Sequence, residues 1–143
     1  LTKTADCQSI LLYDPINRVI GNIHSGWKGT LNTIVINAID IMEKVFHSNK
    51  SSILVFICPS IHKCCFEVEE DVKIPCEEIF CYTNRLDEII KLGRVLDGVQ
   101  KYNIDSILIN KIILEEEGIK EENIYDSNIC SVCKSEKIHS RSY

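Results

Sequence analysis

Two short apolar runs near the start of the chain, joined by turn-forming residues, constrain the fold more than any other feature. The runs cover residues 8–13 and 18–23, and the four residues between them are Asp, Pro, Ile and Asn, which favour a turn. This pattern predicts a β-hairpin. Because the residue before the first strand and the residue after the second lie side by side at the open end, we expect Cys7 and His24 to face one site.

The length and composition predict one domain over residues 1–143. A chain of 143 residues, 45 % of them hydrophobic, can bury a core of its own but is short for two domains. The net charge of −5 argues against nucleic acid or an anionic membrane as partner, because both demand clustered positive charge. The sequence lacks the roughly 20-residue apolar run of a membrane helix and a signal-peptide pattern. We therefore expect a soluble, cytoplasmic protein whose eight cysteines are reduced thiols.

A glycine-containing loop and an amphipathic helix are predicted directly after the hairpin. Thr30 is a candidate N-cap for a helix over residues 31–46, whose apolar residues recur with helical spacing. The order strand, loop, helix places the backbone N–H groups of residues 25–29 at the positive end of the helix dipole. This arrangement favours anion binding, and Lys28 adds a positive charge. Trp27 is either a stacking platform for a base or phenol or a plug in the core.

The rest of the chain alternates between expected strands and helices. The continuous apolar run 53–58 is typical of a strand buried on both faces, and residues 60–68 are expected to form an ordered loop. The further expected elements are a short helix from residue 69 that breaks at Pro75, a helix over 77–81, a helix or strand over 86–92 with a break at Gly93, a strand from Tyr102 that leads into a helix ending at Gly118, and a last strand over 124–129.

The pair Cys130 and Cys133 has the spacing of half a zinc ribbon or of a redox pair. Adjacent residues on an extended segment point in opposite directions, so at most one of Cys64 and Cys65 is expected to face a shared site. No second pair has the same spacing, which makes structural thiols the favoured interpretation over a structural zinc site. A matching half would have to come from Cys64-Cys65, Cys76 or Cys81.

Three ordered motifs carry a resemblance to a known family. They are Thr4-Ala5-Asp6-Cys7, His24-Ser25-Gly26-Trp27-Lys28-Gly29, and the stretch from Cys58-Pro59 to Phe66-Glu67-Val68. With this spacing the chain resembles, over nearly its whole length, the family named in turn multicopper polyphenol oxidoreductase (laccase), purine nucleoside phosphorylase and peptidoglycan editing factor. Residues 104–110, 129–133 and 140–141 resemble the weaker C-terminal motifs of that family.

The resemblance implies an α/β/β/α-type fold, that is, an α/β (α+β) layered sandwich with a mixed β-sheet core and flanking helices. It also implies a surface metal site, usually zinc, held by two histidines and one cysteine. Cys7 and His24 match two of these ligands. The third belongs to the family's N-terminal part, which lies before the start of this chain, and the family's closing tail would follow Tyr143.

The resemblance therefore implies a zinc-dependent purine nucleoside phosphorylase acting on inosine, adenosine or methylthioadenosine, with adenosine deamination as a further activity. Phosphorolysis needs an anion held beside a departing base, and deamination needs a water activated by the metal. The small-molecule partners would be a purine nucleoside and phosphate. The implied catalytic residues are Cys7, His24 and Asp6, and the implied substrate and anion ligands are Ser25, Gly26, Trp27, Lys28 and Arg141.

Other functions remain open. Copper-dependent phenol oxidation needs many histidine ligands, whereas this chain has four, at positions 24, 47, 62 and 139, scattered along its length. A peptidoglycan-editing hydrolase and a catalytically silent binding or assembly unit are further alternatives. His62 is expected either as a surface loop residue or as a residue that approaches the metal.

Cys7 could act as a metal ligand or as a nucleophile activated by His24. The neighbouring Asp6 opposes formation of a free thiolate, whereas a divalent cation favours it. We therefore predict that Cys7 is a metal ligand.

Overall fold

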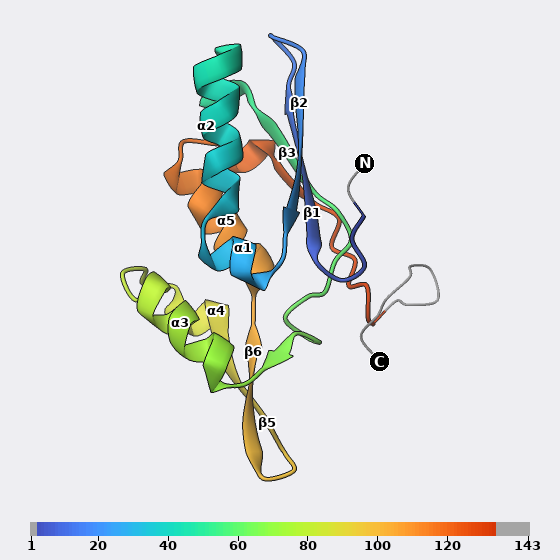
Figure 1. Cartoon of the computed structure of the whole chain (residues 1–143), viewed down its shortest axis with the longest axis vertical. Helices are drawn as coiled ribbons and strands as arrows, with labels where there is room; N and C mark the ends of the chain where they lie inside the picture. Colours follow the sequence, from blue (N-terminus) through green and yellow to red (C-terminus); the bar gives the residue numbers. More distant parts are fainter. Residues whose placement is uncertain (1–2, 134–143) are drawn as a thin grey trace.

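The computed structural model describes residues 3–133, which contain two β-sheets and five α-helices (Figure 1). The strands are β1 (Gln8–Asp14), β2 (Val19–Ser25), β3 (Leu54–Ile57), β4 (Glu67–Val68), β5 (Ile90–Leu96), β6 (Val99–Ile104) and β7 (Ile124–Asp126). The helices are α1 (Trp27–Leu31), α2 (Ile34–Phe46), α3 (Glu70–Phe80), α4 (Leu86–Ile89) and α5 (Ser106–Glu116), with short 3-10 turns at Lys50–Ser52 and Glu121–Asn123. This mixed α/β architecture confirms the expected fold class.

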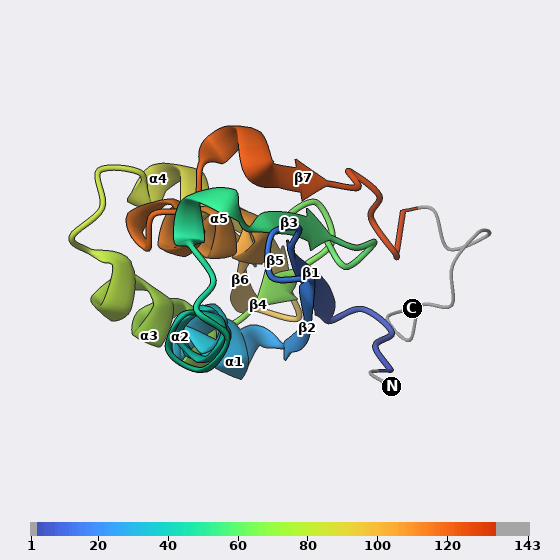
Figure 2. The same cartoon turned by 90° about the horizontal axis from the view of Figure 1, so that it is seen from above.

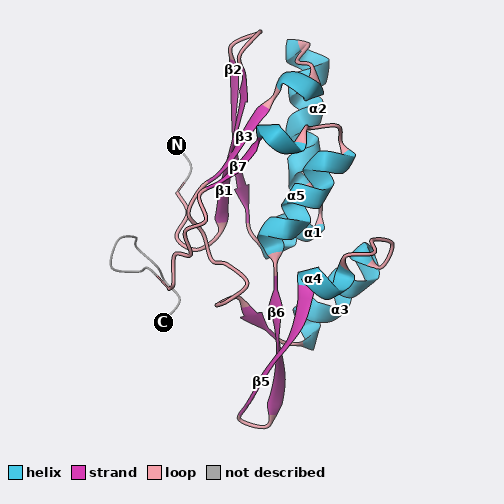
Figure 3. Cartoon of the chain, turned by 180° about the vertical axis from the view of Figure 1, so that it is seen from behind, coloured by secondary structure: helices cyan, strands magenta, loops and turns pink. Residues whose placement is uncertain are grey.

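The larger sheet has four strands in the order β2-β1-β3-β7. Strands β2, β1 and β3 pair in antiparallel fashion, whereas β7 runs parallel to β3, so the sheet is mixed. Helices α2 and α5 cover one face of this sheet (Figures 2 and 3). Because alternate strand residues point toward these helices, the core lies between the sheet and the helix layer.

The predicted hairpin is confirmed, although its strands end slightly later than expected. Strands β1 and β2 are antiparallel, and their register pairs Ser9 with His24. His24 therefore lies inside β2 rather than after it. Cys7 lies instead beside Gly26, where a Cβ atom would be 3.5 Å from the Cys7 sulfur.

The helices after the hairpin begin at other residues than expected. Helix α1 begins at Trp27, and Thr30 is buried inside it instead of capping the next helix. The Thr30 hydroxyl lies 2.9 Å from Ser25 Oγ, so a tertiary partner takes the place of the local cap. Helix α2 begins only at Ile34, after Thr33 with φ of 52°.

Helix α3 continues through Pro75 instead of breaking there. Its buried residues Val72, Cys76 and Phe80 recur every four positions and pack into the core. Burial of this stripe outweighs the loss of the backbone hydrogen bond that the proline cannot donate.

The smaller sheet has the order β4-β6-β5 and lies beyond the open end of the hairpin, next to α3 and α4 (Figure 1). Asp97 and Gly98, with φ of 51° and 78°, form the tight turn between β5 and β6. The expected break at Gly93 is wrong, because this glycine lies inside β5. A Cβ atom at Gly93 would be 2.8 Å from the Lys101 carbonyl oxygen, so only glycine fits this close approach of two strands.

The strand and helix expected from Tyr102 onward are present as β6 and α5. Asp105 caps α5 by accepting a 2.9 Å hydrogen bond from the Leu108 N–H. Gly118, with φ of 94°, follows the helix at its expected end. The last strand is shorter than expected, since β7 ends at Asp126.

None of the helices within residues 3–133 is long and apolar enough to cross a membrane. The longest of them, α2, has 13 residues, whereas a membrane span needs about 20.

Candidate functional site

A cavity of about 320 Å³ lies where the open end of the hairpin meets the loop after β3 and the start of α5. Five residues that the sequence singled out line it: Asp6, Cys7, Ser25, Gly26 and Trp27. A volume near 300 Å³ is at the lower end of the range for small-molecule sites. Residues at the start of β1 and at the end of β2 thus meet around one cavity that is large enough for a small ligand.

The loop after β3 and strand β4 supply another wall of this cavity, including Ile61, Cys65, Phe66 and Glu67. Together with Trp27, Phe66 gives the cavity two aromatic side chains that a flat ring could contact. Trp27 is 37 % exposed and belongs to the cavity rather than to the core. Of its two expected roles, a stacking platform fits this position and a core plug does not.

Cys7 is half-buried at the cavity, and its pKa lies above the ordinary value of a thiol. Burial is the main cause, and the negative charge of Asp6 adds to it. The thiol is therefore protonated at neutral pH unless a cation is bound to it. This agrees with the expected effect of Asp6 and disfavours a free Cys7 nucleophile.

Asp6 is held in place by two neighbouring segments. Its carboxylate accepts a 2.7 Å hydrogen bond from the Ser131 hydroxyl, and its carbonyl oxygen accepts a 2.8 Å bond from the Ile61 N–H. Hydrogen bonds from both sides restrict the carboxylate to the cavity wall. The sequence distance between these partners explains why sequence reasoning missed them.

His24 is exposed and does not line the cavity described above. On β2 its side chain points away from the buried face that carries Ile23 and Ser25. Within residues 3–133, no cluster of three or more candidate metal ligands includes Cys7 or His24. The hairpin brings the two residues to the same end of the sheet, and their joint metal site stays a prediction.

The predicted anion-binding segment is a helical turn rather than a loop, because α1 begins at Trp27. Lys28 is exposed, and its Nζ atom lies 5.3 Å from the centre of the Trp27 ring, beside the cavity wall. Among the described lining residues, the two charged ones, Asp6 and Glu67, are both acidic. Lys28 is not among the lining residues, so its role as the cation of this site stays a prediction, and Arg141 lies outside the described residues.

A buried polar network underlies the cavity and was not predicted. The Gln8 side chain donates a 2.8 Å hydrogen bond to the Ser106 hydroxyl, and Asn110 donates a 3.0 Å bond to the Gln8 side-chain oxygen. The Asn110 amide also lies 3.3 Å from Ser25 Oγ and 3.4 Å from Thr30 Oγ1. All five side chains are buried, so the network locks the hairpin end to α1 and α5. The one sequence signal was an asparagine within the apolar stripe of α5.

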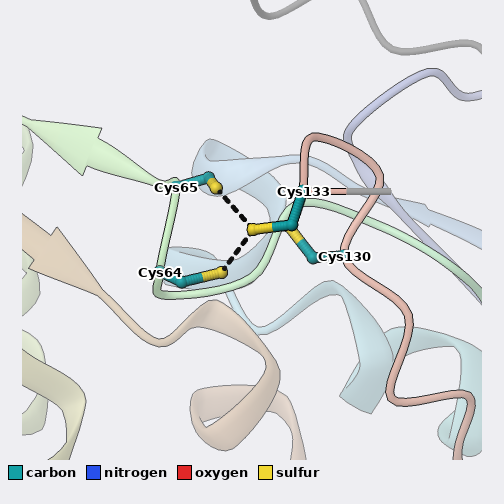
Figure 4. Close-up of side chains that lie close together, drawn as sticks. All are labelled: Cys64, Cys65, Cys130 and Cys133. Carbon is teal, nitrogen blue, oxygen red and sulfur yellow. Dashed lines mark hydrogen bonds between the residues drawn. The ribbon is translucent and has the colours of Figure 1, made fainter. Parts of the chain in front are cut away.

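A cluster of four cysteines lies next to the cavity (Figure 4). The sulfur atoms of Cys64, Cys65, Cys130 and Cys133 all lie within 4.8 Å of one another. Cys133 Sγ is 3.1 Å from Cys65 Sγ and 3.4 Å from Cys64 Sγ. The cluster could bind a metal ion, and Cys65 belongs to both the cluster and the cavity wall.

The expectation that only one of Cys64 and Cys65 could face a shared site is wrong. Residues 63–65 form a turn, in which the Cys65 N–H donates a 2.9 Å hydrogen bond to the His62 carbonyl oxygen. A turn does not impose the alternation of an extended strand, so both thiols point toward Cys133 (Figure 4). The second half of the cysteine pair at 130 and 133 is therefore this adjacent pair.

The thiols of the cluster differ in acidity. Burial and the neighbouring Cys133 raise the pKa of Cys64 to about 11, and the same causes raise the pKa of Cys65. Although burial opposes ionisation of Cys130, backbone N–H groups of Cys133, His62 and Val132 lower its pKa to about 7. All eight cysteines are free thiols, with Cys76 buried in α3 and Cys81 exposed at its end.

The cavity beside Cys7 thus combines aromatic and carboxylate side chains within a layered α/β fold, and its size suits a small ligand. The sequence profile of the family described as multi-copper polyphenol oxidoreductase laccase matches residues 1–142. The chain belongs to this family.

Curated relatives of the chain are named purine nucleoside phosphorylase. The protein of this name from Clostridium acetobutylicum is 35 % identical over 133 residues, which are 93 % of this chain and 51 % of that protein. The one from Borreliella burgdorferi is 31 % identical over 129 residues, 90 % of this chain and 52 % of that protein. The chain thus spans about half the length of these relatives.

Solved structures share the fold. The hypothetical protein YfiH from Bacillus licheniformis matches with a TM-score of 0.82 and 26 % identity, over 96 % of this chain and 49 % of that one. The YlmD protein from Geobacillus stearothermophilus matches with a TM-score of 0.79 and 25 % identity, over 96 % of this chain and 48 % of that one. These matches confirm the arrangement of strands and helices.

Proposed function

We propose that the chain carries the nucleoside-binding part of a purine nucleoside phosphorylase. The observation that carries this proposal is the cavity beside Cys7, whose walls combine Trp27 and Phe66 with two carboxylates. Aromatic faces suit a purine base, and the carboxylates of Asp6 and Glu67 can accept hydrogen bonds from ribose hydroxyl or purine N–H groups. The names of the curated relatives support the same substrate class.

Phosphorolysis joins a phosphate oxygen to the sugar carbon that carries the base, while the bond from that carbon to the base nitrogen breaks. The base leaves with the bonding electrons and takes up a proton. In this proposal Trp27 orients the base and Lys28 attracts the phosphate. The buried network beneath Ser25 keeps the end of the hairpin fixed, so that Trp27 and Lys28 keep their positions relative to each other.

Cys7 and His24 are proposed as two ligands of a zinc ion at this site. Thiolate and imidazole are donors that zinc prefers, and the raised pKa of Cys7 means that a cation would have to stabilise its thiolate. The donor types fit zinc, and within residues 3–133 no third candidate ligand lies close to this pair. When bound, zinc would supply positive charge beside the reacting nucleoside, and adenosine deamination is proposed as a second reaction there.

Copper-dependent phenol oxidation is less well supported by the side chains. The ligand cluster found within residues 3–133 contains four cysteines and no histidine, whereas Cu(II) sites are typically rich in imidazole. We therefore rank phosphorolysis first.

A Lys28→Met variant should bind phosphate more weakly. Loss of one charge-assisted contact is expected to raise the KM for phosphate by about tenfold, because hydrogen bonds to charged groups contribute about 1.5–3 kcal/mol. Steady-state rates at varied phosphate and saturating inosine measure this change. Lys44→Met, at the opposite end of α2 and paired with Asp40, is the control. An unchanged KM for phosphate would remove Lys28 from the proposed site.

The proposal itself is tested by measuring hypoxanthine release from inosine with and without phosphate. We expect release that requires phosphate and yields ribose 1-phosphate in equal amount. Release of hypoxanthine at the same rate without phosphate would identify a hydrolase instead.

A further inference from the structure

We propose that Cys64, Cys65, Cys130 and Cys133 bind one zinc ion in a closed tetrathiolate site, separate from Cys7 and His24. This zinc would fasten the segment after β7 to the loop after β3. The proposal concerns a structural metal and does not depend on the phosphorylase activity.

The sulfur positions suit a single metal ion. With zinc–sulfur bonds of about 2.3 Å, the sulfur atoms of a tetrahedral site lie about 3.8 Å apart. All four Sγ atoms here lie within 4.8 Å of one another, and Cys133 Sγ lies 3.1 Å from Cys65 Sγ and 3.4 Å from Cys64 Sγ. These two pairs are about 0.7 and 0.4 Å short of the required spacing, so shifts of less than 1 Å would bring them to it. Four thiolate donors favour zinc among common divalent ions.

The backbone around the cluster has the form that metal-binding cysteines require. Two turns meet there, over residues 63–65 and 131–133, and each presents two sulfur atoms toward the other (Figure 4). Backbone N–H groups of His62, Val132 and Cys133 face the Cys130 sulfur. Such N–H groups orient a ligand and offset the negative charge of a thiolate.

The same place joins three segments that are distant in sequence. The Ser131 N–H donates a 2.9 Å hydrogen bond to the Ser60 carbonyl oxygen, and the Ser131 hydroxyl bonds to Asp6. Strand β7 has only three residues and lies at the edge of its sheet, so few backbone bonds hold this end of the chain. A metal at the cluster would add a cross-link where the sheet pairing is short.

Cys65 connects this metal to the cavity, because its side chain lines the cavity wall and Phe66 and Glu67 follow it directly. Zinc at the cluster would hold the wall that these residues form. The ion would have four protein ligands and no open position, which is the arrangement of structural rather than catalytic zinc.

The test compares zinc content in a Cys7→Ser background, which removes the ligand proposed at the other site. In that background we expect one zinc per chain, measured by elemental analysis after purification under reducing conditions without added metal. Adding Cys133→Ser should remove this zinc and lower the melting temperature by about 10 °C, because a bound ion stabilises only the folded state. Adding Cys81→Ser, an exposed thiol outside the cluster, should change neither value.

A second measurement needs no cluster variant. Cobalt(II) added to metal-free Cys7→Ser protein should give the strong absorption of thiolate-to-cobalt charge transfer, and one equivalent of zinc should abolish it.

Equal zinc content with and without Cys133→Ser would overturn the proposal. So would stoichiometric iron instead of zinc, or a count of six free thiols in the wild-type chain, which would indicate a disulfide in the cluster.

Discussion

A Cys7→Ala variant is expected to lose at least about a hundredfold of its rate of inosine phosphorolysis. Exchanging residues that merely orient a metal ligand costs about 10- to 100-fold in metal affinity or activity, so removing the ligand itself should cost at least as much. Initial rates at saturating phosphate measure this loss. Cys58→Ala, a half-buried thiol outside the cavity lining, is the matched control and should retain activity.

The same cysteine should react slowly with iodoacetamide. Only the thiolate is alkylated, and burial together with Asp6 raises the pKa of Cys7 above that of an ordinary thiol. In metal-free protein the alkylation rate of Cys7 should therefore rise with pH, and the midpoint of this rise should lie at a higher pH than for an ordinary thiol. Asp6→Asn should move this midpoint to lower pH, because it removes the charge that opposes ionisation. Peptide mass spectrometry follows Cys7 separately from the other seven cysteines.

Zinc should protect Cys7 from alkylation until a chelator is added. Rapid labelling of Cys7 in zinc-loaded, active protein, with capture of a covalent substrate adduct, would show that it is a nucleophile. A Cys7→Ala variant with wild-type activity would remove it from the site altogether.

A Trp27→Ala variant should bind inosine about 10- to 100-fold more weakly. Stacking of a base on an aromatic side chain contributes about 1–3 kcal/mol, and Trp27 is half-exposed at the cavity wall. The KM for inosine should rise accordingly, while the KM for phosphate changes little. Trp27→Phe keeps an aromatic face and should recover most of the affinity.

Trp27 also offers a direct reading of binding, because it is the single tryptophan of the chain. Inosine should quench its fluorescence with saturation near the KM. Tyr82→Ala is the control, because Tyr82 is an exposed aromatic residue just after the end of α3 and outside the cavity lining, and this variant should bind inosine normally. Equal inosine affinity in Trp27→Ala and wild-type protein would show that the base binds elsewhere.

Those parts of the site that depend on the hairpin could be predicted from sequence. Turn residues and alternating burial are local signals, and a hairpin necessarily brings its two ends together. Asp6, Cys7, Gly26 and Trp27 therefore lie around one cavity at the open end of the hairpin. The register, however, differs from the expected one by two residues, because His24 pairs with Ser9 rather than with Cys7, and His24 lies within β2 on its exposed face.

Features that depend on contacts distant in sequence could not be predicted in the same way. The turn at residues 63–65 has no strong sequence signal, so Cys64-Cys65 could be named only as one candidate partner of the later pair, and the approach of both thiols to Cys133 could not be predicted. The hydrogen bond between Gln8 and Asn110 joins residues that are 102 positions apart, so no local sequence pattern indicates it. The predicted helix break at Pro75 is wrong because tertiary burial of one face of α3 outweighs the tendency of proline to end a helix.

If the cavity beside Cys7 and Trp27 belongs to a purine nucleoside phosphorylase, phosphate must be consumed as the base is released. The most direct test is to titrate phosphate against inosine in the protein that contains this chain, and to measure hypoxanthine and ribose 1-phosphate together. We expect equal amounts of both products, with a rate that saturates in phosphate and falls to background without it. Zinc-loaded protein that releases no hypoxanthine at any phosphate concentration, or releases it equally well without phosphate, would show that the cavity does not serve phosphorolysis.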